Sequence, residues 1–194
     1  GTCAAAAAKA AAAFLLCGKA DSDYSELTLP GGTVCRIPVT RYEPEQETES
    51  PAFCFFVRKD SGDDPDVTNG IAVYSRVSFR NDKQETEGYI WENGGLCLRL
   101  TAGEGVGTVT KPGLACEVGK PAINPVPREM IFTHVEKVCR QYGFQGSLNI
   151  EIFIPQGAEI SKKTFNPRMG IKGGISLLGT SGMVEPMSEK ALTD

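Results

Sequence analysis

Carboxylates are concentrated in one short stretch of the sequence, "KDSGDDPDVTNG", which covers residues 59–70 and lies between two apolar runs. Its acidic residues are Asp60, Asp63, Asp64 and Asp66. Neighbouring carboxylates repel one another, which raises the pKa of one member and suits it to act as a general base. Aspartate and glycine at a strand-to-strand turn also satisfy backbone N–H groups. The stretch therefore has two interpretations, a catalytic site and a structural turn.

Metal binding is not supported by the sequence. If Asp64 is taken as the first residue of an EF-hand loop, Asn69 replaces the turn glycine and Ser75 replaces the terminal glutamate, so the calcium pattern fails. The seven cysteines, at positions 3, 17, 35, 54, 97, 116 and 139, form no CxxC pair. We expect them to be reduced, mostly buried thiols, and we expect no protein-bound metal.

Two glycine-rich stretches resemble phosphate-binding loops but lack a required feature. "AGEGVGTVTKPG" carries Gly103, Gly105 and Gly107, yet a β-rich run follows where a dinucleotide-binding loop needs a helix. A close approach of a ligand to these glycines is still possible. "GISLLGTS" has Thr180 where a P-loop needs lysine, so P-loop ATP hydrolysis is unsupported. Its glycines, with Thr180 and Ser181, suit either an anion site or a set of turns.

Positive charge is concentrated in "SKKTFNPRMGIKGG", which carries Lys162, Lys163, Arg168 and Lys172 and no acidic residue. The whole chain is acidic, with a formal charge of -4, so we expect no general electrostatic field that attracts nucleic acid. These cations therefore form a local candidate site for an anion, or else a solvated face. The single histidine, His134, lies beside an apolar helix face and is expected to be structural.

The order of elements predicts an α+β fold. Residues 2–17 are alanine-rich and are expected to form a helix with Thr2 as N-cap and Gly18 as the stop. A second helix is expected from about 127 to 142, because apolar residues recur there at helical spacing. The remaining apolar runs have strand composition, without regular alternation of strands and helices. We expect one domain over residues 1–194, with a largely antiparallel or mixed sheet and the two helices packed on it.

The location and the two ends of the chain also carry expectations. The longest apolar run is interrupted by Lys9 and is shorter than a membrane-spanning helix, and no signal-peptide pattern precedes it. We expect a cytoplasmic protein that does not bind membranes. The sequence starts at a helix entrance and ends in "EPMSEKALTD", a beginning helix, so we expect it to be part of a longer protein.

Four long stretches together resemble the CbiD family, the cobalt-precorrin-5B C1-methyltransferases of anaerobic cobalamin biosynthesis. They are "GTCAAAAAKAA", "KDSGDDPDVTNG", "GEGVGTVTKPGLACEVGKPAINPVPREMI" and "TFNPRMGIKGGISLLGTSGMVEPMSEKAL", in order along the whole chain. The resemblance implies methyl transfer from S-adenosylmethionine to C1 of cobalt-precorrin-5B, which gives cobalt-precorrin-6A. It also implies a second half that is absent here, in which we expect the S-adenosylmethionine site. The cobalt belongs to the substrate.

The candidate site residues lie within these stretches, except Lys162 and Lys163, which come directly before the fourth stretch. Asp63 and Asp64 are the catalytic candidates, to accept a proton from the macrocycle or to orient the sulfonium. The candidates for binding the carboxylate-rich tetrapyrrole are Lys59, Asp60, Asp66, Thr68, Gly105, Gly107, Asn124, Arg128, Lys162, Lys163, Asn166, Arg168, Lys172, Thr180 and Ser181. The alternative is a non-catalytic tetrapyrrole-binding or assembly domain, with the methyl chemistry in the other half. The sequence leaves the oligomeric state open.

Overall fold

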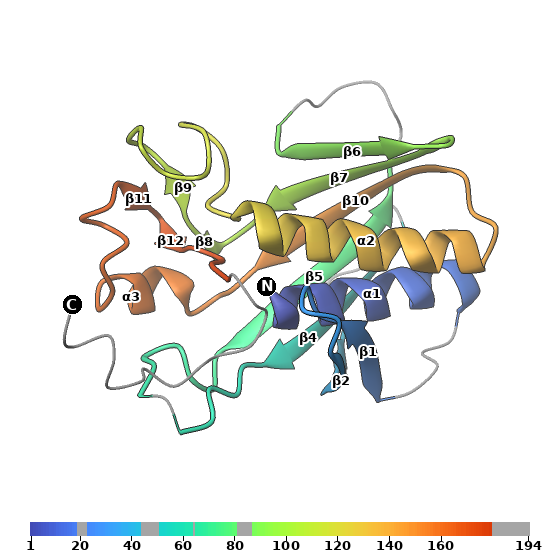
Figure 1. Cartoon of the computed structure of the whole chain (residues 1–194), viewed down its shortest axis with the longest axis horizontal. Helices are drawn as coiled ribbons and strands as arrows, with labels where there is room; N and C mark the ends of the chain where they lie inside the picture. The colour runs from blue at the N-terminus through green and yellow to red at the C-terminus, as the bar shows by residue number, and fades with distance from the viewer. Residues whose placement is uncertain (19–22, 44–50, 64, 81–86, 180–194) are drawn as a thin grey trace.

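The structure is a computed structural model of the chain, and it describes residues 1–18, 23–43, 51–63, 65–80 and 87–179 (Figure 1). The two long helices are α1 (Thr2–Cys17) and α2 (Pro125–Gln141). Alanine has the highest helix propensity, which explains α1, and Gly18 ends it in the left-handed conformation with φ 71°. Gly1, and not Thr2, is the N-cap, so that expectation was wrong by one residue. The helix expected after residue 185 lies outside the described residues.

A six-stranded mixed sheet forms the centre of the fold, in the order β3-β4-β5-β10-β7-β6. Its strands are β3 (Thr40–Tyr42), β4 (Ala52–Arg58), β5 (Ala72–Phe79), β6 (Tyr89–Asn93), β7 (Leu96–Ala102) and β10 (Gly146–Phe153). All neighbours are antiparallel except β7 and β10, which are parallel because α2 connects them as a crossover. The α+β prediction with a mixed sheet and two main helices is confirmed.

Smaller elements surround the sheet. A hairpin is formed by β1 (Tyr24–Thr28) and β2 (Val34–Pro38). The short strands β8 (Gly105–Val106), β9 (Thr108–Val109), β11 (Ile171–Lys172) and β12 (Gly174–Ile175) pair as β8 with β12 and β9 with β11. Together with α3 (Gly157–Ser161) they lie beyond the starts of both long helices (Figure 1).

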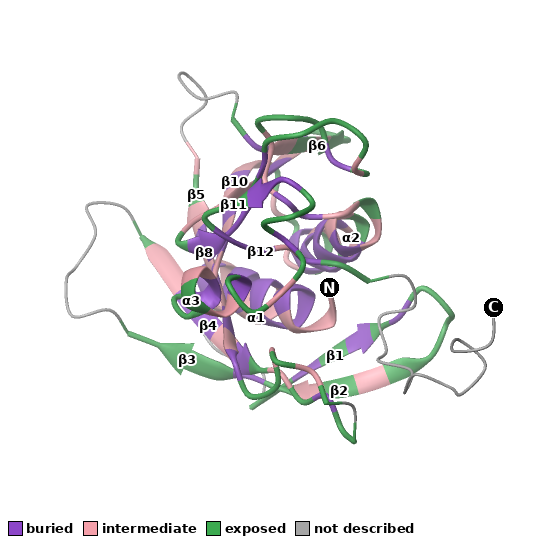
Figure 2. Cartoon of the chain, turned by 90° about the vertical axis from the view of Figure 1, so that its left-hand side faces the viewer, coloured by how far each residue is buried: buried purple, intermediate pink, exposed green. Residues whose placement is uncertain are grey.

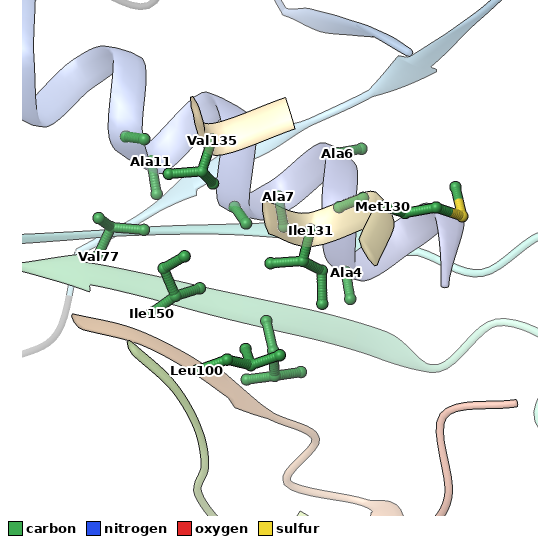
Figure 3. Packing of buried hydrophobic residues seen from close by; sticks show 14 of the residues in the cluster. Ala4, Ala6, Ala7, Ala11, Val77, Leu100, Met130, Ile131, Val135 and Ile150 are labelled. Atoms are coloured by element: carbon green, nitrogen blue, oxygen red, sulfur yellow. The ribbon is translucent and has the colours of Figure 1, made fainter. Parts of the chain in front are cut away.

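The hydrophobic core lies between the two long helices and one face of the sheet. Figure 3 shows Ala4, Ala7 and Ala11 of α1 near Ile131 and Val135 of α2. This layer is almost completely buried: seven alanines of α1 are at most 1% exposed. The small alanine side chains let α1 approach α2 and the sheet closely, and this explains why the helix is nearly free of large residues on its inner side. Figure 2 shows the buried segments gathered between the helices and the sheet.

The opposite face of the sheet carries a row of aromatic rings. Tyr74 stacks on Phe153 with ring centroids 4.9 Å apart and also contacts Phe56 and Tyr42. These side chains alternate with residues that point to the helices, as strand geometry requires. The seven cysteines are all free thiols; Cys54, Cys116 and Cys139 are buried and the other four are half-buried.

Candidate functional site

One edge of the sheet brings together most of the residues that the sequence singled out. The carboxyl ends of β4, β7 and β10 lie at this edge, because β4 and β10 flank β5 in antiparallel pairs and β7 is parallel to β10. Helix α2 starts there after β7, and Gly1 packs against Pro127 and Met130, so α1 starts there too. Figure 1 shows this edge at the left, with both helices starting beside it. Two helix starts present free backbone N–H groups, which favour anions.

The aspartate-rich loop of residues 59–70 lies at this edge between β4 and β5, and Lys59 and Asp66 organise it. The Lys59 Nζ forms an ion pair with Asp66 and donates a hydrogen bond to Thr68 Oγ1 at 2.5 Å. Asp66 Oδ1 also accepts hydrogen bonds from the backbone N–H and the hydroxyl of Thr68, both at 2.7 Å. Partial burial raises the pKa of Asp66, but the hydrogen bonds from Lys59 and Thr68 outweigh it, so the pKa lies below its ordinary value.

Other polar groups of this loop also bond within the loop. Asp60 accepts a hydrogen bond from the Gly62 N–H at 2.8 Å, and Asn69 accepts one from the Ser61 N–H at 3.0 Å. These contacts favour the turn interpretation for Asp60 and Asp66, since both carboxylates satisfy groups of their own loop. Asp63 is exposed, whereas Asp64 lies outside the described residues. Asp63 is therefore the described aspartate best placed to meet a ligand.

Gly105 and Gly107 are approached by the protein's own backbone. A Cβ atom on Gly105 would lie 1.7 Å from the Ile154 carbonyl oxygen, and Gly105 has φ +75°. Cβ atoms on Gly157 and Gly174 would lie 2.0 and 2.1 Å from the Gly105 carbonyl oxygen. A Cβ on Gly107 would lie 2.3 Å from a methyl group of Ile171. These glycines thus let β8, β12 and α3 pack together, and the space at Gly105 and Gly107 is filled by protein.

The four predicted cations near the end of the chain are all exposed on or near α3 and β11. Lys162 forms an ion pair with Glu159 at 2.6 Å, and the Arg168 guanidinium lies 6.0 Å from the Phe165 ring centre. Asn166 differs from them because it is buried and accepts a hydrogen bond from Ser176 at 2.9 Å, so its side chain has a structural role. Thr180 and Ser181 lie outside the described residues.

Arg128, in the first turns of α2, lines a cavity that the sequence did not predict. Its guanidinium carbon lies 4.0 Å from the ring centre of Tyr89 on β6, the edge strand. The cavity has a volume of about 330 Å³ and is lined mainly by aromatic and apolar groups. Its walls include Tyr89, Trp91, Pro125, Arg128, Glu129 and Phe132. A signal was present in the sequence: Tyr89 and Trp91 alternate on one strand, and Arg128 and Phe132 are four residues apart on a helix.

Asn124 and Tyr89 are fixed close to this cavity. Asn124 is the N-cap of α2, but its side chain makes no capping hydrogen bond; its Oδ1 accepts a weak contact from the Cys116 thiol at 3.5 Å. The Tyr89 hydroxyl donates to the Pro121 carbonyl oxygen at 2.8 Å, and burial raises the pKa of Tyr89. Tyr89 is therefore held as a neutral phenol whose ring supports Arg128.

His134 has a structural role, as expected from its place beside an apolar helix face. It is 3% exposed, and its Nε2 lies 3.1 Å from the Thr28 carbonyl oxygen of the hairpin. Burial lowers its pKa below the ordinary value, so the neutral imidazole is favoured in the folded protein. Among the described residues, no group of three or more His, Cys, Asp or Glu side chains is placed to hold a metal ion. None of the described helices is long and apolar enough to cross a membrane.

The fold and the edge define an α+β protein with a mixed sheet, two parallel helices on one face and polar loops at their starts. The model of the CbiD family matches residues 1–186, so the chain belongs to the CbiD family. The family resemblance seen in the sequence is confirmed.

Several proteins named cobalt-precorrin-5B C(1)-methyltransferase are similar to this chain. The protein of Treponema denticola is 47% identical over 99% of this chain, and that of Moorella thermoacetica is 48% identical over 98%. The alignments cover 48% and 46% of those proteins, so the chain spans about half the length of the curated relatives it matches. The crystal structure of cobalamin biosynthesis protein (cbiD) from Archaeoglobus fulgidus aligns with a TM-score of 0.64 and 30% identity, over 99% of this chain and 56% of that one.

Proposed function

We propose that this chain is the N-terminal part of an S-adenosylmethionine-dependent methyltransferase that methylates C1 of cobalt-precorrin-5B and yields cobalt-precorrin-6A in the cytoplasm. The observation that carries this proposal is the 47% identity, over nearly the whole chain, to a protein named cobalt-precorrin-5B C(1)-methyltransferase. Residues 1–194 form one domain of the complete enzyme, and the remaining half of the relatives' length supplies the rest.

The site of the methyl donor lies in that remaining half. S-adenosylmethionine supplies an electrophilic methyl group, whose transfer to carbon is an in-line displacement that depends on positioning. Within the described residues, the glycines that best suited a nucleotide-like ligand do not fit one, because Ile154 and Gly174 occupy the space at Gly105. No step of the reaction is therefore assigned to a donor site in this chain.

This chain binds the tetrapyrrole at the edge where α1 and α2 start. The acetate and propionate side chains of the substrate are carboxylates, and arginine and lysine bind carboxylates by charge-assisted hydrogen bonds. Arg128 and the exposed Lys163, Arg168 and Lys172 are the cations best placed for this role, since Lys59 and Lys162 are already paired with Asp66 and Glu159. The substrate carries the cobalt.

Asp63 and Asp64 are the proposed acid–base residues of this part of the enzyme. Asp63 is exposed in the loop at the same edge, where a carboxylate can accept a proton from the macrocycle or stabilise the sulfonium charge. Asp60 and Asp66 are less suited to this role, since each already accepts hydrogen bonds within the loop.

The second candidate function is a tetrapyrrole-binding or assembly domain without catalytic residues. The filled space around Gly105 favours it, because it removes the best candidate donor site from this chain. The two candidates are separated by the complete enzyme carrying Asp63→Asn and Asp64→Asn, because only the catalytic candidate predicts that methyl transfer is lost. Calorimetric titration of the chain with S-adenosylmethionine tests what the two candidates share, a donor site outside this chain. No binding is expected, and binding with a saturable heat would place the donor site here and argue against the purely structural domain.

The proposed reaction is tested with the complete protein, which we expect to be about twice as long. It is incubated without oxygen with cobalt-precorrin-5B and S-adenosylmethionine labelled in its methyl group. Label in the tetrapyrrole, at C1 by NMR, is the expected result. Absence of label from a folded protein that binds both compounds would refute the proposed reaction.

A further inference from the structure

The cavity between α2 and β6 contains a cation whose hydrogen-bonding groups are not all used. Arg128 Nε is buried, and within the described part of the chain it has no hydrogen-bond partner. A buried polar group without a hydrogen-bond partner lowers the stability of the protein unless a bound group satisfies it. Arg128 therefore lacks a hydrogen-bond acceptor, and it lines a cavity of about 330 Å³.

The position of Arg128 is fixed by its surroundings. Its guanidinium lies 4.0 Å above the Tyr89 ring, and the Tyr89 hydroxyl is anchored to the Pro121 carbonyl oxygen. A guanidinium that rests on an aromatic face keeps its N–H edges available for a planar, two-oxygen acceptor. Arg128 is thus oriented before any ligand arrives, which reduces the entropy lost on binding.

The other walls of the cavity are mostly apolar. The rings of Trp91 and Phe132 stack with centroids 6.4 Å apart and are inclined by 21°. Pro125 and Ile90 add further apolar surface. Glu129 also lines the cavity, with its side chain exposed to solvent. No described carboxylate forms an ion pair with Arg128.

We propose that this cavity binds a carboxylate carried on an apolar body, with Arg128 as the anchor of the carboxylate and Tyr89, Trp91 and Phe132 as the apolar walls. The chemistry on both sides is complementary: a bidentate cation for the carboxylate, and aromatic surface for the hydrocarbon next to it. Resting on the proposed function, the natural occupant is one carboxylate side arm of the tetrapyrrole, with its adjoining pyrrole ring against the aromatic walls.

The first test uses small probes and does not depend on the proposed function. Trp91 is the only tryptophan of the chain, so its fluorescence reports on this cavity alone. The chain is titrated with 3-phenylpropionate and, separately, with the uncharged 3-phenylpropanamide. We expect saturable binding of the carboxylate, with a dissociation constant on the order of 1 mM for so small a ligand, and at least about tenfold weaker binding of the amide.

Variants assign the binding to Arg128. Arg128→Met is expected to weaken 3-phenylpropionate binding at least about tenfold, and Arg128→Lys to restore part of it. Arg140→Met is the matched control, because Arg140 lies on the same helix but near its other end, where it pairs with Glu136. If Arg128→Met does not fold, Thr133→Phe tests the same point, since it fills the cavity and leaves Arg128 in place. Equal binding of acid and amide, or equal losses in the Arg128 and Arg140 variants, would overturn the proposal.

The second test asks whether the substrate uses the cavity. The chain and its Arg128→Met variant are titrated with cobalt-precorrin-5B or a close cobalt-tetrapyrrole analogue, followed by the visible absorption of the tetrapyrrole. A loss of tetrapyrrole affinity of at least about tenfold in the variant supports the side-arm assignment. If the variant loses 3-phenylpropionate binding but keeps its affinity for the tetrapyrrole, the side-arm assignment is refuted, while the cavity is still shown to bind carboxylates. Failure of the wild-type chain to bind any tetrapyrrole counts against the proposed function, whereas the probe titration still decides the cavity.

Discussion

Lys59 and Asp66 form an ion pair inside the loop that joins β4 to β5, and Asp66 also accepts two hydrogen bonds from Thr68. The composition of this loop suggests a set of free carboxylates, but the loop is partly a turn held by hydrogen bonds to its own side chains. The aspartates divide into two kinds: Asp60 and Asp66 accept hydrogen bonds within the loop, whereas Asp63, exposed like Asp60, accepts none among the described residues.

Asp66→Ala is predicted to destabilise the fold by about 1–2 kcal/mol, because it removes three interactions of the loop and leaves Lys59 without its ion-pair partner. Asp63→Ala is the matched control, since Asp63 is exposed in the same loop, and it should change the free energy of unfolding by less than about 0.5 kcal/mol. Urea denaturation measures both. Equal effects of the two substitutions would contradict the division of roles.

The double substitution Asp63→Asn with Asp64→Asn is predicted to abolish methyl transfer by the complete enzyme while its melting temperature stays within about 2 °C. The reason is that both changes preserve size and remove only the charge needed for proton transfer or for stabilising the sulfonium. Labelled-methyl incorporation and a thermal melt are measured on the same sample. Full activity would eliminate the catalytic role, and a fall in melting temperature would indicate a structural one.

Gly105→Ala is predicted to destabilise the fold by more than about 3 kcal/mol, because its Cβ would meet the Ile154 carbonyl oxygen at 1.7 Å. Gly113→Ala has a similar positive φ, +99°, but no atom within 4 Å of its Cβ, so it should cost only about 1 kcal/mol of backbone strain. Both variants carry backbone strain, so the difference between their free energies of unfolding measures the steric contact at Gly105. Similar denaturation midpoints for both variants would show that Gly105 is not tightly packed.

The burial of His134 is predicted to make the folded protein less stable as the pH falls. Its folded-state pKa lies below the ordinary value of 6.5, so the unfolded chain binds the proton more readily than the folded one. The stabilisation from the neutral imidazole is complete above about pH 6.5 and decreases as the pH falls from there to the folded-state pKa. His134→Gln should remove this part of the pH dependence.

The comparison is made by urea denaturation of the wild type and the variant at pH 7.5, 6.5 and 5.5. The difference in unfolding free energy between the two is expected to shrink as the pH falls. A difference that is constant across this range would mean that His134 does not titrate abnormally in the folded protein.

Local features of the fold could be predicted because their signals are local. The alanine run and Gly18 give α1, and the spacing of Ile131, Val135 and Val138 gives α2, which starts slightly earlier than predicted, at Pro125 after its N-cap Asn124. The strand order could not be predicted, since β10 inserts between β5 and β7, far from either in the sequence, and no local pattern specifies such pairing.

The candidate site was predictable in its residues but less so in their roles. The position of the acidic loop between two strands was correct, whereas the internal bonds of Lys59 and Asp66 depend on side-chain geometry. Gly105 suggested a ligand because a glycine-rich sequence looks the same whether a ligand or the Ile154 backbone approaches it. The cavity at Arg128 could not be predicted, because it forms only where β6 and α2 come together in the tertiary structure.

The central claim is that this chain carries the binding site for the tetrapyrrole at the edge where α1 and α2 start. An anaerobic titration of the chain with a cobalt-precorrin, followed by the visible absorption of the tetrapyrrole, tests it most directly. The account predicts a saturable spectral change at one equivalent of tetrapyrrole per chain. A spectrum that stays that of the free tetrapyrrole at a large excess of folded chain would contradict it.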